Sequence, residues 1–181
     1  MTAEEVKVLV RGAFVTASYP GDGELVRSAG DEPDEVVELF RSRADWRRLT
    51  PEFVDRAGAA SPSALSFFSD RAFRFYLPAY LISDLDRQLV YTDPLFYVDH
   101  GLDQASREKP VTVSGKKTLT WWEVQQDRFA GFTSDEAAAI VAYMRWRASD
   151  DALAGHERRS IQEALGAYWL NKVGEAQGRP R

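Results

Sequence analysis

The sequence predicts a mainly α fold, a compact single-domain helical bundle that carries one small β-hairpin. Apolar residues recur at helical spacing, next to capping signals, along most of the chain. Only the stretch around residues 111–121 joins two β-branched arms through a turn that contains glycine. Hydrophobic residues make up 44% of the 181 residues, which is enough for a core without a disulfide or a metal. We expect one globular domain over residues 1–173 and a frayed tail over 174–181.

The composition excludes several classes of site and partner. The chain has no cysteine and two histidines, which predicts no disulfide and disfavours a zinc site. We expect no metal and no cofactor, and a carboxylate-rich Mg²⁺ or Mn²⁺ site is the alternative. A net charge of −5 disfavours nucleic acid and anionic membranes, which attract clustered lysine and arginine. Glu4 and Glu5 precede the first apolar residues, unlike the basic start of a secretory signal, so we expect a cytoplasmic protein.

Capping signals place the first helices. Thr2 and Glu5 form a capping box that predicts a helix from Ala3, before a turn at 19–23. The range 31–43 predicts a second helix, because acids crowd its start and arginines its end, in accord with the helix dipole. A threonine before a proline at 50–51 predicts a short third helix.

The segment 64–82 is the expected spine of the core. It gathers six aromatic side chains: Phe67, Phe68, Phe73, Phe75, Tyr76 and Tyr80. Each ring gains about 2–3 kcal/mol on burial, so this segment belongs in the interior. Ser69 caps the helix, and Pro78 predicts either a kink or a break into two short helices.

The second half of the chain changes pattern. The range 89–92 predicts a strand, and Asp93-Pro94 a turn. The hairpin follows, with arms at 111–113 and 118–121. Thr133 and Glu136 form another capping box, which opens a long helix. A last helix carries an apolar stripe that includes Trp169.

Several phrases of the sequence are similar to a family of small bacterial proteins known as a domain of unknown function. The distinctive phrase is FRFYLPAYLI at 73–82, supported by YPGD at 19–22 and LSFFS at 65–69. The resemblance runs from about Val6 to Trp169, and the segment 111–121 departs from it as an expected insertion. It implies a compact bacterial domain and carries over no functional residue.

Asp99 and His100 are the candidate catalytic residues. A carboxylate beside an imidazole can tune a general base near neutral pH, and this pair follows an apolar run. The alternative is a solvated loop histidine.

Trp121, Trp122 and Glu123 are the candidate binding residues. On a strand, adjacent tryptophans point to opposite faces, which leaves one ring to contact a partner. The alternative is that the core covers one ring and a loop covers the other.

Two hypotheses about function follow. The first is a non-enzymatic bacterial protein-binding domain, such as an immunity or antitoxin-like neutraliser whose acidic surface masks a basic toxin. The alternative is an enzyme with a site assembled around Asp99 and His100, whose reaction the sequence does not specify. The oligomeric state stays open.

Overall fold

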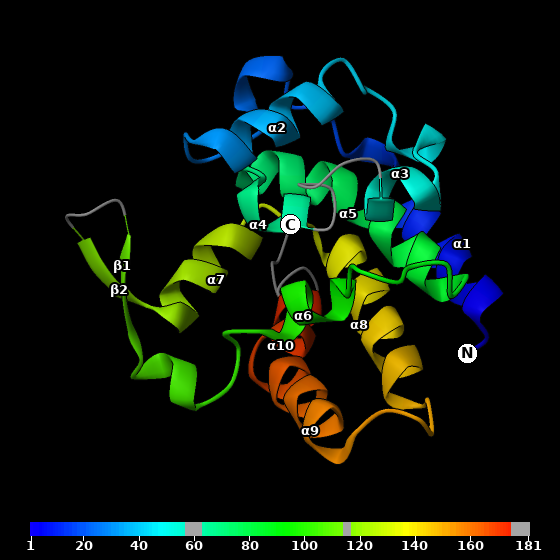
Figure 1. Cartoon of the computed structure of the whole chain (residues 1–181). Helices are drawn as coiled ribbons and strands as arrows, with labels where there is room; N and C mark the ends of the chain where they lie inside the picture. The colour runs from blue at the N-terminus through cyan, green and yellow to red at the C-terminus, as the bar shows by residue number, and fades with distance from the viewer. Residues whose placement is uncertain (57–62, 114–116, 175–181) are drawn as a thin grey trace, which may run out of the picture. The chain divides into compact units, whose positions relative to one another are not determined.

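The computed structural model describes residues 1–56, 63–113 and 117–174, and these residues are mainly α-helical (Figure 1). The predicted fold class is therefore confirmed. The chain forms two compact units, Met1–Tyr97 and Val98–Arg181, and the division falls inside helix α6, Pro94–Asp99. The single domain over 1–173 stays a prediction. Of the expected frayed tail, residue 174 ends a helix and 175–181 lie outside the described residues.

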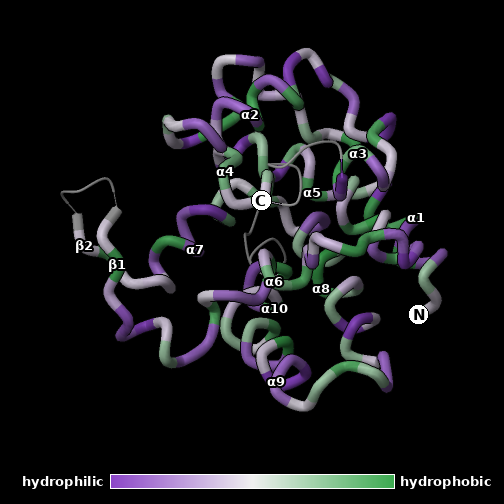
Figure 2. Tube along the Cα trace, viewed as in Figure 1, coloured by the Kyte–Doolittle hydropathy of each residue, from purple (hydrophilic) through white to green (hydrophobic). Residues whose placement is uncertain are grey.

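The first unit is built from helices and short 3-10 turns. The helices are α1 (Ala3–Ala13), α2 (Asp31–Phe40), α3 (Pro51–Arg56), α4 (Ala64–Phe67) and α5 (Asp70–Leu85). The 3-10 turns are Phe14–Thr16, Asp22–Glu24 and Trp46–Arg48. The capping box of Thr2 and Glu5 is present, and Ser69 accepts the Ala72 N–H at the start of α5. Helix α2 passes from a hydrophilic start to a more hydrophobic end (Figure 2).

Helix α5 runs unbroken through Pro78, so a break into two helices is wrong. Proline removes one backbone donor, but packing on neighbouring elements supplies more free energy than one lost hydrogen bond. The stripe that the spacing predicted is fully buried: Phe73, Tyr76, Leu77, Tyr80 and Leu81. The Tyr76 ring centroid lies 4.9 Å from that of Phe40 and 5.1 Å from that of Phe68. The predicted spine is therefore the core of this unit.

The strand predicted at 89–92 is wrong, because these residues wrap around a buried carboxylate. The backbone N–H groups of Val90, Tyr91 and Thr92 donate to Asp55 at 2.9, 3.0 and 2.9 Å. Because these backbone N–H groups donate to a side chain of α3, they do not form the hydrogen bonds that would pair this segment with another strand. Asp93 then accepts the Leu95 N–H at 3.1 Å, so Asp93-Pro94 opens α6.

The second unit contains the hairpin and the remaining helices. The strands are β1 (Pro110–Val113) and β2 (Lys117–Thr120), and the helices are α7 (Trp121–Phe129), α8 (Ser134–Ala148), α9 (Gly155–Ala164) and α10 (Leu170–Gly174). A 3-10 turn lies at Ala105–Arg107, and a π turn at Leu165–Trp169 joins α9 to α10. The strands pair antiparallel from Pro110 with Thr120 to Val113 with Lys117. The hairpin is confirmed, and its connection at 114–116 lies outside the described residues.

Aromatic rings form the core of the second unit. The centroid of the buried Trp169 ring lies 4.8 Å from that of Phe129 and 5.9 Å from that of Phe132. Trp169 Nε1 donates to the Val98 carbonyl at 2.7 Å, which satisfies the one polar atom of the indole. The predicted capping box of Thr133 and Glu136 is present at the start of α8.

Candidate functional site

The two adjacent tryptophans begin helix α7, so the prediction that they continue a strand is wrong. Thr120 is the N-cap: its Oγ1 accepts the Glu123 N–H at 3.2 Å, and its own N–H donates to Glu123 Oε2 at 2.7 Å. This capping box has the same T-x-x-E signature that marks α1 and α8. The signal was therefore available in the sequence, but the β-branched residues just before it favoured a longer strand.

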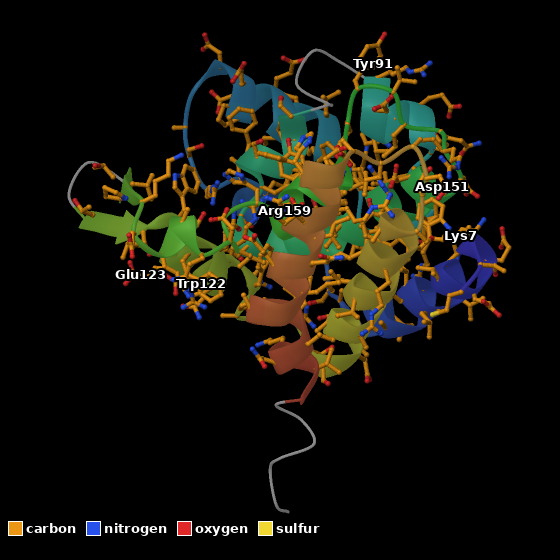
Figure 3. The ribbon with its side chains drawn as sticks, turned by 90° about the horizontal axis from the view of Figure 1, so that it is seen from below. Lys7, Tyr91, Trp122, Glu123, Asp151 and Arg159 are labelled. Carbon is orange, nitrogen blue, oxygen red and sulfur yellow. The ribbon has the colours of Figure 1, made fainter. Side chains whose placement is uncertain are left out.

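The helix gives the two rings different environments. Consecutive helical residues are roughly 100° apart rather than on opposite faces. Trp122 is 7% exposed, and the Arg107 guanidinium lies 3.6 Å from the centroid of its ring. Trp121 is partly exposed. Trp122 and the exposed Glu123 lie side by side where the hairpin passes into α7 (Figure 3). Trp122 therefore packs within its unit, whereas part of Trp121 is open to a partner.

His100 lies against Trp121, with ring centroids 5.4 Å apart and planes at 72°. Gly101, at φ +80°, makes the turn that brings them together. A Cβ at Gly101 would sit 2.8 Å from Gln125 Cγ, so only glycine fits there without a shift. Burial is the main cause that lowers the His100 pKa; Lys109 adds to this effect and Asp103 opposes it. The neutral imidazole is therefore favoured in the folded protein.

Asp99 is buried at the end of α6. Its backbone carbonyl accepts the Leu102 N–H at 3.3 Å, which closes the turn at His100. The acid whose charge raises the His100 pKa is Asp103, four residues further along the chain. Asp103 also accepts the backbone N–H of Ser106 at 2.7 Å. The catalytic role suggested for Asp99 and His100 stays a prediction.

A second feature, in the first unit, was not foreseen as a site. A half-open hollow of about 410 Å³ is lined by Ser42, Arg43, Ala44, Asp45, Arg48 and Leu49. The arginines of this region fit a solvated helix face on sequence alone. Helix α2 ends at Phe40 instead, and the chain turns at Ser42, where φ is +59°. We name this feature the arginine hollow, and its lining contains none of the candidate residues from the second unit.

The described residues form neither a metal-binding cluster nor a membrane-spanning helix. Within residues 1–56, 63–113 and 117–174, no group of three or more histidines, aspartates or glutamates could hold a metal ion. In the same ranges, every helix is too short or too polar to cross a bilayer.

Comparison with known proteins gives a family and no activity. The profile of a family of unknown function, DUF6714, matches residues 26–173, which include every described helix from α2 to α9. No curated protein and no solved structure matches the chain. The match covers most of the sequence and agrees with the expected resemblance to a domain of unknown function. The chain therefore belongs to DUF6714, a family of unknown function.

Proposed function

We propose that this chain is a non-enzymatic protein-binding domain whose contact surface is Trp121 together with strands β1 and β2, called here the hairpin surface. The observation that carries the proposal is that, in the described part of the chain, these strands pair only with each other, directly beside a partly exposed tryptophan. The hairpin also points away from the helices of its own unit (Figure 1).

An open strand edge is a template for another strand. A partner in extended conformation adds to such an edge through backbone hydrogen bonds, and nearby pockets and rings supply selectivity. The Trp121 N–H donates to the Lys109 carbonyl at 3.1 Å, so the ordered backbone pairing reaches the foot of the hairpin. Tryptophan is among the residues that contribute most to protein interfaces. The hairpin surface therefore combines a backbone template with an apolar anchor.

Charge favours a basic partner. The chain as a whole carries a net charge of −5, and the exposed Glu123 and Asp127 lie on the helix that follows the hairpin, whereas the exposed Arg107 and Lys109 precede β1. Acidic surfaces speed association with basic proteins and exclude acidic ones. A bacterial immunity or antitoxin-like neutraliser of a basic toxin is the finer form of this proposal.

The test is crosslinking of the full-length chain in extracts of the organism that carries its gene, followed by mapping of the crosslinked residues. We expect a partner that crosslinks at the hairpin surface and is lost in Trp121→Ser. The matched control is Phe96→Ser, which removes another large exposed ring, 51% exposed, from α6. Equal capture by Trp121→Ser and the wild type, or no capture by the wild type, would contradict the proposal.

A charge variant separates binding from folding. Glu123→Gln removes the negative charge but keeps an oxygen that accepts the Thr120 N–H, so the cap of α7 survives. We expect Glu123→Gln to slow association with a basic partner at low salt and to converge with the wild type at high salt.

The alternative is an enzyme with a site around Asp99 and His100. One observation favours it: burial keeps the imidazole neutral, the form in which it accepts a proton. A hollow walled by both residues would support it further.

A further inference from the structure

We propose that the arginine hollow binds a small organic oxyanion, either a phosphate monoester or a carboxylate. Four arginines and one aspartate lie within residues 41–48, in a chain whose net charge is −5. Two of the arginines, Arg43 and Arg48, line the hollow. A hollow lined by arginines creates a local positive potential on a protein whose net charge is negative.

Arg43 is held in place before any ligand arrives. Its guanidinium lies 4.0 Å from the centroid of the Phe53 ring, and its Nε donates to the Leu39 carbonyl at 2.8 Å. These contacts leave the two terminal nitrogens of the guanidinium for an oxyanion. A preorganised arginine loses less conformational entropy on binding than a mobile one does.

The positive charge of the hollow is only partly neutralised by the protein. Among the described residues, neither Arg43 nor Arg48 has an acid within ion-pair distance, whereas Arg41 pairs with Glu38. The acid in the lining, Asp45, accepts Arg47 Nε at 2.8 Å and the Arg47 backbone N–H at 3.1 Å. Asp45 is therefore already bound by Arg47. The charge of Arg48 also acts on Asp45, but without an ion pair, so both lining guanidinium groups keep hydrogen-bond donors for a ligand.

The walls of the hollow are fixed to the rest of the first unit. The Ser42 N–H donates to Asp22 Oδ1 at 2.7 Å, and the Tyr19 hydroxyl donates to the same oxygen. From the core side, the Tyr76 hydroxyl donates to the Arg43 carbonyl at 3.0 Å. These contacts tie the left-handed turn at Ser42 to two other segments. The site is thus largely preformed, as small-molecule sites usually are.

The ligand class follows from the chemistry of the lining. Two guanidinium groups recognise oxyanions through paired, charge-assisted hydrogen bonds. Ala44 and Leu49 add apolar wall, and about 410 Å³ lies within the usual range for small organic ligands. The shared chemistry is therefore a compact carbon skeleton that bears a phosphate or carboxylate group.

The test is calorimetric titration of the full-length protein with glycerol 3-phosphate and, separately, with succinate at low salt. We expect saturable binding of one or both. Arg48→Gln removes a charge-assisted contact and should weaken binding about tenfold. Arg11→Gln is the matched control, because Arg11 is an exposed arginine of α1, outside the hollow, and its loss should leave affinity unchanged.

A gain-of-affinity variant makes the test sharper. Asp45→Asn removes the negative charge from the lining but keeps an oxygen that accepts the Arg47 N–H, so the turn at Trp46–Arg48 stays capped. We expect Asp45→Asn to tighten binding about threefold. Binding of glycerol 3-phosphate alone would identify the phosphate as the recognised group, and binding of succinate alone would identify the carboxylate.

Three results would overturn the proposal. One is the absence of saturable binding of either compound in the millimolar range. Another is an equal loss of affinity in Arg48→Gln and Arg11→Gln, which would indicate only a general, screened attraction. The third is weaker binding by Asp45→Asn. Circular dichroism of each variant confirms that the fold is retained, and Arg48 is exposed, so its substitution removes no buried contact.

Discussion

Asp55 is a buried carboxylate that no sequence pattern singled out. It accepts three consecutive backbone N–H groups, from Val90, Tyr91 and Thr92, and also the Nε of its neighbour Arg56 at 3.3 Å. Burial raises the Asp55 pKa, but the backbone hydrogen bonds outweigh it, and the pKa is lowered overall. The contact spans some 35 positions along the chain, so local periodicity cannot reveal it.

We expect Asp55→Ala to lower the free energy of unfolding by about 3 kcal/mol, because it leaves one buried and two part-buried backbone donors without their acceptor. The pKa of Asp55 is lower in the folded than in the unfolded chain, so its stabilisation is present above the unfolded pKa of about 3.9. It is lost as the pH falls through the folded pKa. Urea unfolding of both proteins should therefore differ at pH 7 and converge in strong acid, whereas Glu52→Ala, an exposed acid on the same helix, should change little.

His100 also makes the free energy of unfolding depend on pH, but here the cause is burial of the side chain rather than hydrogen bonding to its charged form. Its folded pKa is lowered, mainly by burial, so the unfolded chain binds the proton more readily. Its contribution to stability is complete above the unfolded pKa of about 6.5 and declines as the pH falls below it. We expect His100→Gln to flatten the loss of stability between neutral and mildly acidic pH in urea titrations. His156→Gln, at an exposed position of α9, is the control and should keep the wild-type slope.

At the scale of elements, capping signals predicted the starts of helices better than β-branched residues predicted the end of a strand. Thr2, Ser69 and Thr133 were expected as N-caps, and each accepts the expected backbone N–H. The same signature at Thr120 follows β-branched residues, which by themselves favour a strand. A cap is a local hydrogen bond and is visible in the sequence, whereas the end of a strand depends on which partner it pairs with.

The cap of α7 is testable on its own. We expect Thr120→Ala to lower the free energy of unfolding by about 1 kcal/mol, since it removes the acceptor of the Glu123 N–H. Thr118→Ala, on the exposed part of β2, should have a smaller effect. Chemical unfolding followed by circular dichroism measures both, and equal losses would show that the cap adds nothing specific.

Helix α5 carries two tyrosines with opposite hydrogen bonding. The Tyr76 hydroxyl donates to the Arg43 carbonyl at 3.0 Å, whereas the buried Tyr80 hydroxyl has no partner among the described residues. A buried hydroxyl without a partner costs free energy. We therefore expect Tyr80→Phe to raise stability by about 1 kcal/mol and Tyr76→Phe to lower it by a similar amount. Thermal unfolding should shift in opposite directions, and equal shifts would contradict this account.

At the scale of the whole molecule, the sequence predicted the mainly α class, the aromatic core of α5 and the hairpin. It missed the arginine hollow and the ring of donors around Asp55, because both depend on how a loop turns against a distant segment. Of the candidate site, Trp121 and His100 were found as separate residues. Their contact depends on the turn at Gly101 and on a helix start at Trp121 that was read as strand.

If residues 1–173 form a single domain, as the sequence predicts, the two units should unfold together in one cooperative transition. The division between the two units falls inside the six residues of α6, so neither unit contains that helix whole. We expect one unfolding transition, shared by the fluorescence of Trp46 in the first unit and of Trp169 in the second. The chain has five tryptophans, so variants that keep Trp46 or Trp169 as their single tryptophan, with the other four replaced, report each unit separately. Two resolved midpoints would show that the units unfold independently.

The π turn at Leu165–Trp169 has an evolutionary consequence. A π turn is equivalent to one extra residue inserted into a helix, and one residue rotates everything beyond it by roughly 100°. In the helical register that the π turn sets, Trp169 Nε1 donates to the Val98 carbonyl. Deleting a single residue such as Gly166 would restore an ordinary helix and swing the indole out of line with its acceptor. A chain without Gly166 would therefore need a residue from a different place in its sequence to fill the core position of Trp169.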